Sequence, residues 1–372
     1  MKKRSTSEQS PKRAANSRTA TGSYTIGMDL GDKHSRYCRL DEEGAVVEEG
    51  SVATTKKALL QRFGARKRCR IAMEVGTHSP WVSRLLSRLG HEAIVANARQ
   101  VQLISQSSRK DDRLDAQTLA RLARIDPQLL RPIRHRSEKA QQDLLAIRVR
   151  ATLVEARTGL VNAARGLAKA AGERLPKCDT DNLGPAALAE LPQGLQEGLR
   201  PLLEQVESLT VQIKASDLRI EQIARNEYPE TELLRQVSGV GPLIALTFVL
   251  TVEDAARFDK SRDVGCYVGL RPKRHQSGES QPQLGISKEG DRYLRTLLVQ
   301  GAHYILHRGP DTDLQRWGWQ LAGRGGKNAK KRAVVAVARK LCVLLHRLWV
   351  TGEVYEPLRN SQTQQRLKQT AA

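Results

Sequence analysis

The stretch YTIGMDLGDKHSRYCRLDEEGAVVEEGSVA (24–53) contains three short runs rich in apolar and β-branched residues, separated by polar turns. Runs of this kind, bounded by Gly, Asp and Ser, are typical of successive β-strands. The following segment TTKKALLQRFG (54–64) has the apolar spacing of a helix, and CRIAMEV (69–75) again has the pattern of a strand. This part of the chain is therefore expected to be a mixed α/β domain that opens with three strands, a helix and a fourth strand.

The pattern continues with a helix ending at Gly90, a strand at 92–98 and a helical stretch that leads into KDDRLDAQTLARL (110–122). This order of elements fits a ribonuclease H-like fold for residues 23–136. The rest of the chain has the apolar spacing typical of helices, so we expect an α/β domain followed by mainly helical domains.

Four carboxylates of the α/β domain occupy positions suited to a metal site. They are Asp29, Glu74, Asp112 and Asp115. The first two close apolar strands, and the last two are three residues apart, so a helix places them on one face. Such carboxylates can converge on divalent cations. Acids with this spacing are also common on solvated helix faces, and the neighbouring Asp32 and Asp111 are alternative ligands. A lone charge at a strand end is unfavourable, which favours the metal interpretation.

Composition restricts the class of protein. The 372 residues contain 62 Lys and Arg against 40 Asp and Glu, a formal net charge of +22, which predicts polyanionic partners and nucleic acid first among them. No apolar run has the length of a membrane span, and the first twenty residues lack the apolar core of a secretory signal. The sequence predicts no membrane association and a cytoplasmic, nucleoid-associated protein. The five cysteines have no zinc-ligand spacing and are expected to be reduced.

The remaining regions differ from one another in composition and in the spacing of their apolar residues. Residues 1–22 are basic and 358–372 polar, and both are expected to be disordered tails. Residues 137–228 are expected to form two long helices with a heptad seam, a coiled-coil arm, joined by a Pro- and Gly-containing connector. In the second helix the expected seam is Leu202, Val206, Leu209, Ile213, Ser216, Ile220 and Ile223. In the first it is Leu145, Val149, Thr152 and Ala156. Periodicity is compatible both with pairing inside one chain and with dimerisation.

The third region, residues 229–357, begins with the glycine-rich motif VSGVGP (237–242) ahead of an apolar helix. Gly239 and Gly241 could form the hairpin of a helix-hairpin-helix element, whose backbone N–H groups approach a DNA phosphate. A plain tight turn between two buried helices explains the same residues nearly as well.

A long loop follows in GLRPKRHQSGESQPQLGISKEGDRYLRTLL (269–298). A serine beside a cluster of cations is placed where a phosphate can be held and attacked. The cations are Arg271, Lys273, Arg274 and His275, and the serine is Ser277. Ser287 is the rival nucleophile, but we expect it to be the N-cap of the helix that starts at KEGDRYLRTLL. Further on, a Gly-rich loop is expected to contact the backbone of DNA or RNA through Lys327, Lys330, Lys331 and Arg332.

Taken together, GMDLG, AMEVGTHSPW, KDDRLDAQTLA, VSGVGPLIA, GLRPKRHQSGE and GISKEGDRYLR resemble the DEDD-type transposases of the insertion sequence 110 family and the related Piv DNA invertases. The resemblance extends from about Tyr24 to Pro357. It implies a RuvC-like domain of ribonuclease H fold, a coiled-coil arm and a C-terminal transposase domain. By this resemblance Asp29, Glu74, Asp112 and Asp115 match the family's metal-binding acids, for Mg²⁺ or Mn²⁺, and Ser277 matches its nucleophilic serine.

The resemblance also implies a mechanism. The acids of one subunit and the serine of another form a composite site in a dimer or tetramer, the serine becomes covalently linked to DNA, and strands exchange through a Holliday-type junction. Donor and target DNA are selected by a noncoding bridge RNA. The long basic N-terminal tail and the length of the loop after Ser277 depart from the usual family pattern.

Two other functions fit parts of the sequence. A RuvC-like Holliday-junction nuclease would use the same acids and a metal-activated water without the serine. A non-catalytic architectural DNA-binding protein would need only the charge and the glycine hairpin.

Overall fold

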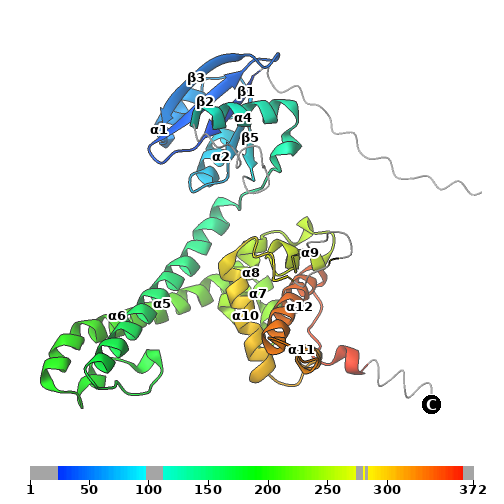
Figure 1. The fold of residues 1–372 in the computed structure, drawn as a ribbon. Helices are drawn as coiled ribbons and strands as arrows, with labels where there is room; N and C mark the ends of the chain where they lie inside the picture. The colour runs from blue at the N-terminus through cyan, green and yellow to red at the C-terminus, as the bar shows by residue number, and fades with distance from the viewer. Residues whose placement is uncertain (1–23, 98–111, 274–279, 281–283, 363–372) are drawn as a thin grey trace, which may run out of the picture. The chain divides into compact units, whose positions relative to one another are not determined.

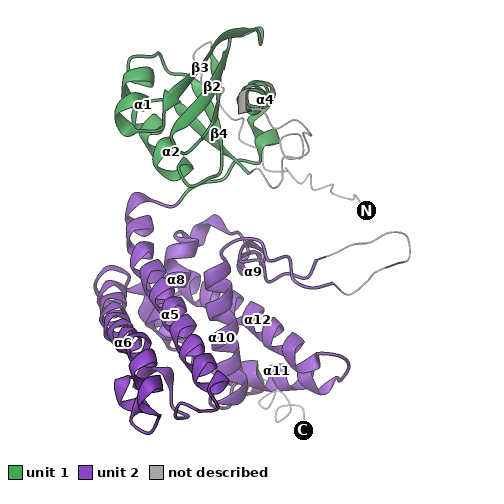
Figure 2. Ribbon diagram, turned by 60° about the vertical axis from the view of Figure 1, so that its left-hand side comes forward, with its two compact units in different colours: residues 1–135 green, residues 136–372 purple. Residues whose placement is uncertain are grey.

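The computed structural model describes residues 24–97, 112–273, 280 and 284–362, apart from the side chains of residues 112 and 113. The chain forms two compact units, residues 1–135 and 136–372, which Figure 2 colours separately. The two long helices and the C-terminal helices share the second unit. The division of the chain into an α/β domain, a helical arm and a C-terminal domain remains a prediction.

The first unit is built on a five-stranded mixed sheet with the strand order β3-β2-β1-β4-β5. β1 (Thr25–Asp29), β2 (His34–Leu40) and β3 (Val46–Ala53) form an antiparallel meander, because short polar turns connect them. β4 (Arg70–Glu74) and β5 (Glu92–Ala96) lie parallel to β1, each after a helical crossover or connection. The mixed α/β architecture expected for this region is confirmed.

Helices cover both faces of this sheet. α1 (Lys56–Phe63) and α2 (Ser79–Arg88) pack on the face that carries Ile26, Met28 and Met73. α4 (Asp112–Ile125) lies on the opposite face, as Figure 2 shows. The period-two alternation of a strand therefore assigns every residue of β1 and β4 to one of two layers.

Gly27 lets α4 approach β1 at backbone distance. A Cβ atom at this position would lie 1.9 Å from the carbonyl oxygen of Ala116 and 2.5 Å from the backbone nitrogen of Ala120. Only glycine leaves this space empty, and the alanines on the helix supply an equally small surface from the other side. The contact fixes α4 directly above the strand that ends in Asp29.

Replacing Gly27 with alanine is expected to push α4 away from the sheet. Forcing a methyl group into such a contact costs about 1–3 kcal/mol of unfolding free energy. Urea unfolding would measure the loss, and faster amide hydrogen exchange in α4 would localise it. Gly76→Ala is the matched control, since a Cβ there meets no atom within 4 Å. Equal stability of the two variants would contradict the role given to Gly27.

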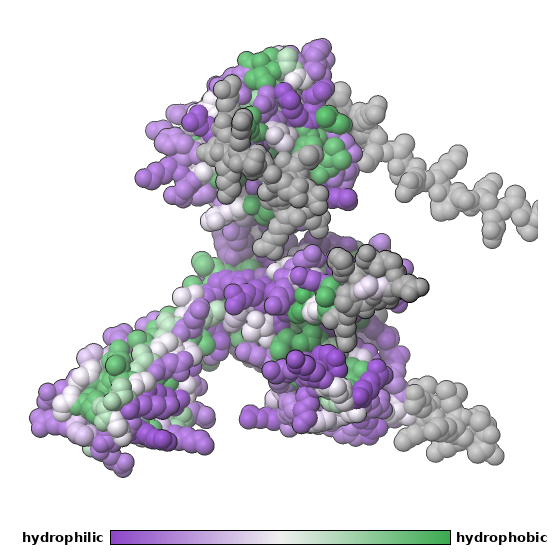
Figure 3. Space-filling model, viewed as in Figure 1, coloured by the Kyte–Doolittle hydropathy of each residue, from purple (hydrophilic) through white to green (hydrophobic). Residues whose placement is uncertain are grey.

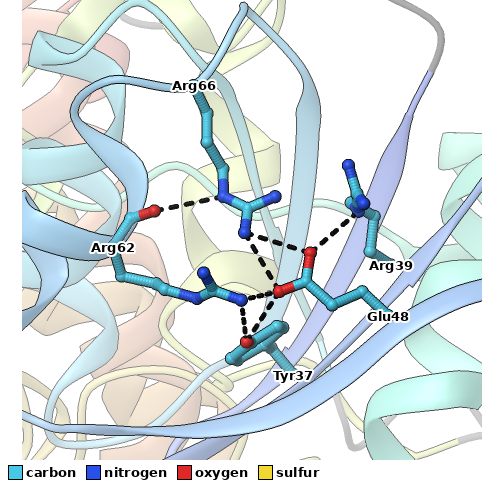
Figure 4. Close-up of polar contacts among 5 residues, drawn as sticks. All are labelled: Tyr37, Arg39, Glu48, Arg62 and Arg66. Atoms are coloured by element: carbon cyan, nitrogen blue, oxygen red, sulfur yellow. Dashed lines mark hydrogen bonds and ion pairs between the residues drawn. The ribbon is translucent and has the colours of Figure 1, made fainter.

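The exposed edge of the sheet is tied to α1 by a cluster around Glu48 of β3 (Figure 4). The carboxylate binds Arg39 of β2 at 3.1 Å and Arg66 at 3.0 Å, and it also pairs with Arg62 of α1. The hydroxyl of Tyr37 donates to the same carboxylate at 2.9 Å. These half-buried ion pairs hold the edge strand against the helix and place charge along an edge that would otherwise be open to pairing.

The second unit begins with two long helices, α5 (Glu138–Ala170) and α6 (Gln193–Glu227), which pack along each other in one chain (Figure 1). The expected seam is correct at Val206, Ile213 and Ile220, which are buried. Leu202, Leu209 and Ile223 are only partly buried, because the seam continues instead through Leu203, Thr210 and Ala224. The seam expected for the first helix is wrong: Leu145 is 61% and Val149 47% exposed, and the buried residues there are Leu144 and Ile147.

Arg157 is a buried cation between the two helices. It donates to Thr210 Oγ1 at 3.0 Å and pairs with Asp181 of the connector at 2.6 Å. A buried polar group with these partners is satisfied in one register of the helix pair, so it favours that register over shifted ones.

In the described residues that follow, six further helices share one apolar core, in which α8 is buried from Ile244 to Val252. They are α7 (Glu230–Arg235), α8 (Pro242–Val252), α9 (Ser261–Tyr267), α10 (Arg292–His307), α11 (Asp313–Gly323) and α12 (Ala329–Thr351). Short 3-10 helices occur at η1 (Pro127–Leu130), η2 (Thr180–Asn182), η3 (Pro185–Leu188) and η4 (Ala255–Arg257). The mainly helical character expected for this half of the chain is confirmed.

The C-terminal segment departs from expectation. Residues 359–362 form a helical turn, whereas disorder was expected from residue 358 onward. The reason is Asp313, whose carboxylate accepts from the backbone nitrogen of Asn360 at 2.7 Å and from Ser361.

Hydrophilic residues predominate on the face of each unit shown in Figure 3. Within the described residues, no helix combines the length and the apolar character that crossing a bilayer requires.

Candidate active site

Asp29 and Glu74 lie side by side at the carboxyl edge of the sheet. β1 and β4 are parallel neighbours in which Met28 pairs with Met73, so the residue after each occupies the last position of its strand. Asp29 and Glu74 lie two residues after Gly27 and Ala72, which face α4, so each acid shares the face of that residue. The two carboxylates therefore project from adjacent strands on the same face.

Asp115 joins them from the first turn of α4, one residue before the helix contact at Ala116. Burial raises the pKa of the Glu74 carboxyl, and the charges of Asp29 and Asp115 raise this pKa further. Among the described residues, Glu74 Oε1 is buried without a hydrogen-bond partner. Negative charge is thus concentrated around an oxygen that has no donor, which is the situation a divalent cation relieves.

The cluster is incomplete in the part of the chain that the structure describes. No three His, Cys, Asp or Glu side chains of that part are arranged closely enough to hold a metal ion by themselves. The side chain of Asp112 and the whole of Asp111 fall outside the described residues. Asp32, the other alternative ligand, has a side chain that is 92% exposed and lies 3.4 Å from Nε2 of His78. Asp32 is therefore oriented toward His78 and solvent.

The raised pKa of Glu74 gives a stability prediction. A carboxyl whose pKa is higher in the folded than in the unfolded chain destabilises the fold when ionised, and this cost disappears as the pH falls through the raised pKa. Glu74→Gln cannot ionise, so with EDTA present it should melt at a higher temperature than the parent chain at about pH 7.5, and the difference should shrink toward about pH 5. Thermal unfolding measures this. Glu43→Gln, in an exposed turn, controls for the substitution, and a lower melting temperature for Glu74→Gln at the higher pH would contradict the prediction.

The second candidate site is the loop that carries Ser277. Ser277, Arg274 and His275 lie outside the described residues, but both ends of the loop are described. Backbone hydrogen bonds join these ends: Lys273 N donates to Gly285 O at 2.9 Å, Ser287 N to Arg271 O at 2.9 Å and Lys288 N to Gly269 O at 3.0 Å. The loop therefore leaves and re-enters the helical unit at one place.

Two glycines and an arginine close the base of this loop. Gly269 and Gly290 both have positive φ angles, and a Cβ on either would lie about 2 Å from a carbonyl oxygen of the opposite segment, Glu289 or Tyr267. Arg295 of α10 donates from Nη1 to the carbonyl oxygens of Val268 and Glu289, both at 2.8 Å. One guanidinium thus binds both segments.

The assignment of Ser287 as a helix N-cap is wrong. α10 starts at Arg292, and its N-cap is Asp291, whose carboxylate accepts from the backbone nitrogen of Leu294 at 2.9 Å. Gly290 crosses the backbone of Tyr267 and keeps the helix from starting earlier. Ser287 lies instead in the base of the loop, where its Oγ is buried without a hydrogen-bond partner among the described residues.

Two protein-family models match this chain. A DEDD transposase model of the IS110 type matches residues 26–171, which include the sheet from its second residue, α4 and all of α5. The model described as the transposase IS116/IS110/IS902 family matches residues 231–315, which include the glycine turn and the loop of Ser277. The chain belongs to the IS110 family of transposases.

Whole-length relatives agree with these matches. The transposase is 28% identical over 340 residues to a probable family 20 transposase of Pseudomonas aeruginosa, covering 89% of this chain and 98% of the relative. It is 29% identical over 339 residues to the transposase for insertion sequence element IS1111A of Coxiella burnetii, covering 89% and 90%. A pilin gene-inverting protein of Moraxella lacunata is 28% identical over 113 residues, covering 30% and 34%. The protein is a DNA transposase, an enzyme of the recombinase class.

The remaining candidate residues of the transposase for nucleic acid lie on its surface. Arg271 and Lys273 are exposed at the base of the Ser277 loop, with Arg271 3.6 Å from Glu289. Lys327, Lys330, Lys331 and Arg332 are all exposed at the amino end of α12. Cations are unfavourable there because the helix dipole is positive at this end. A polyanion would offset that cost.

The two glycines of the turn before α8 differ. Gly239 has a φ of +88°, and a Cβ there would lie 2.9 Å from Cδ1 of Tyr304 on α10. Packing against α10 explains this glycine fully. Gly241 meets no atom within 4 Å of its would-be Cβ, so its surface is open to a ligand. These contacts concern the Cβ positions alone, so the phosphate-binding role of both glycines stays a prediction.

Three positioning residues of the transposase were not singled out from the sequence. Gly27 seats α4 above Asp29, while Gly290 and Arg295 close the base of the Ser277 loop. A glycine inside an apolar strand is a signal of close backbone approach, so Gly27 could have been found. The role of Arg295 depends on carbonyl groups from two distant segments and has no sequence signal.

Proposed function

We propose that this transposase cuts and rejoins DNA with Asp29, Glu74, Asp112 and Asp115 as metal ligands and Ser277 as the nucleophile. The strand order β3-β2-β1-β4-β5, with an antiparallel meander and two parallel strands, supports a RuvC-like domain of ribonuclease H fold. The single observation that supports the proposal is the placement of Asp29 and Glu74 at the ends of adjacent parallel strands, on the face that α4 covers.

The donor set suits a hard cation. Carboxylate oxygens are the ligands that Mg²⁺ and Mn²⁺ prefer, and the buried Glu74 Oε1 lacks a donor among the described residues. When bound, such cations would lower the pKa of a nucleophile and stabilise the oxygen that leaves the phosphodiester. The chain's own residues hold the acids in place: Gly27 brings α4 to the sheet, and the strand register sets Asp29 beside Glu74.

Ser277 supplies the covalent step of the proposal. Its hydroxyl loses a proton and forms an ester bond to the DNA phosphorus, while the bond from phosphorus to one deoxyribose oxygen breaks and that oxygen takes up a proton. Attack by a deoxyribose hydroxyl on the phosphoserine reverses the exchange and releases the serine. No net hydrolysis or redox change occurs, so rejoining needs no external energy source.

Partners beyond DNA belong to the same proposal. Donor and target DNA together with a bridge RNA would account for a net charge of +22. The paired helices α5 and α6 are proposed to act as a coiled-coil arm in a dimer or tetramer, in which the acids of one subunit meet the serine of another.

A trapping assay tests the proposal. The full chain is incubated with Mg²⁺, DNA spanning the end of its element, and RNA transcribed from the noncoding end of that element, then run on a denaturing gel. A covalent protein–DNA band that requires the metal supports it. Metal-dependent cleavage without a covalent band would favour a Holliday-junction nuclease, and binding alone would favour an architectural protein.

A further inference from the structure

Arg36 lies directly across the sheet from Asp29. β1 and β2 are antiparallel, and their register pairs Asp29 with Arg36 and Gly27 with Cys38. Residues opposed in this way project to the same face of a sheet. Cys38 packs with Ala116 and Ala120 of α4, so this is the α4 face. Arg36 therefore belongs to the face that carries Asp29 and Glu74.

Arg36 differs from the other residues of β2 on this face. Cys38 and Leu40 are buried beneath α4, while Arg36 is exposed beyond the end of that contact. In the described part of the chain, its guanidinium makes no hydrogen bond or ion pair. Arg39, three residues further along β2 and on the opposite face, is paired with Glu48 at 3.1 Å. Arg36 thus keeps all of its donors available next to the acidic edge.

The next residue across the sheet leaves this space open. In the register of β2 with β3, Arg36 is paired with Ser51, a small and exposed residue. One face of the sheet therefore carries, in a row across three strands, the acid Asp29, the cation Arg36 and the short hydroxyl side chain of Ser51. Ser51 is short, so it leaves room beside the Arg36 side chain for a phosphodiester strand.

We propose that Arg36 binds the phosphate of the DNA strand at the carboxylate cluster and holds its non-bridging oxygens during cleavage. This inference rests on the proposed function of the cluster. Asp29, Glu74 and Asp115 repel a phosphate, and charge develops on its oxygens in the transition state. A guanidinium offers two parallel donors that match two phosphate oxygens. Arg36 is the cation that the strand register places beside Asp29 on this face.

The contact is tested by removing the charge of Arg36 from the protein and the charge of the cleaved phosphate from the DNA. Arg36→Ala is compared with the parent chain on DNA spanning the element end, with guide RNA and Mg²⁺, and on the same DNA with one uncharged methylphosphonate at the cleaved position. Cleavage of the normal phosphate should fall roughly 100-fold or more, the effect of removing one transition-state donor. On the methylphosphonate, which carries no charge for Arg36 to neutralise, the two proteins should differ by only a few-fold. Arg36→Lys should restore part of the loss on the normal phosphate.

Two controls separate the possible failures. Arg68→Ala removes an exposed cation from the opposite, amino end of β4 and should cleave both substrates like the parent chain. Asp29→Ala should lose cleavage of both substrates. If Arg36→Ala cleaves the normal phosphate at the parent rate, or loses as much on the methylphosphonate as on the phosphate, the Arg36 contact is overturned while the acids keep their role. If Asp29→Ala remains active, the proposed function itself fails.

Discussion

Replacing Ser277 with alanine is expected to abolish the covalent protein–DNA intermediate while leaving DNA binding intact. The side chain supplies the oxygen that attacks phosphorus in the cleavage step, so cleavage should fall on the order of 10³-fold or more. Binding depends on cations spread over the surface of a chain with a net charge of +22, and the loss of one hydroxyl leaves that charge unchanged. A denaturing gel with labelled DNA measures the intermediate, and fluorescence anisotropy measures binding.

Two serines in the same loop provide controls. Ser280 is exposed, so Ser280→Ala should trap DNA like the parent chain. Ser287 is set in the base of the loop with its Oγ buried, so Ser287→Ala should also retain trapping. A covalent band that persists in Ser277→Ala and disappears in Ser287→Ala would transfer the nucleophile to Ser287.

Replacing Asp29 with alanine is expected to remove metal-dependent cleavage and trapping together. Asp29 stands at the centre of the acidic edge, beside Glu74 and facing the helix that carries Asp115. Metal ions contribute several kcal/mol of transition-state stabilisation, which corresponds to about 10³-fold or more in rate. Isothermal titration with Mn²⁺ should show weaker binding, and the cleavage assay should show the rate loss.

Asp32→Ala is the matched control for Asp29→Ala, since it removes the same charge three residues later. Its carboxylate is oriented toward His78 and solvent, so cleavage should stay near the parent rate. Equal losses in the two variants would mean that net charge in this region, and not the ligand geometry of Asp29, governs activity.

The placement of Asp29 and Glu74 was predictable because a strand fixes it. Alternation along an apolar strand determines the face of each residue, and adjacent parallel strands end at the same edge. Two acids that close two such strands therefore meet when the strands are parallel neighbours, as β1 and β4 are. The same reasoning located Asp115 within one face of a helix, and its effect on the pKa of Glu74 agrees with that placement.

The helix pair shows where periodicity fails. Leu144 and Leu145 are both apolar, as are Ile147 and Val149, so the sequence of α5 supports two overlapping seams. Contact with α6 and with Leu246 and Leu250 of α8 decides between them, and these residues are about a hundred positions away. The sequence could not reveal that partner, because tertiary packing overrides local pattern in such a case.

The prediction of where the helix after the Ser277 loop begins was wrong for a related reason. Ser287 and Asp291 are both good N-cap residues, and local sequence does not rank them. The crossing of Gly290 over Tyr267 delays the helix until Asp291, and it depends on a segment more than twenty positions earlier. Capping preferences describe one turn of chain and contain no information about such a crossing.

Because the base of the Ser277 loop is closed, the loop and its proposed nucleophile form a segment that can be exchanged as a unit. Gly269, Gly290 and Arg295 join its two ends through backbone contacts that do not depend on what lies between Lys273 and Gly285. The entropic cost of closing a loop between two fixed ends rises only slowly with its length. Loops of different lengths can therefore be joined to this base without disturbing the helices. For protein engineering, the serine and its cations can then be exchanged between family members as one block, with the junctions set at the two ends of this base.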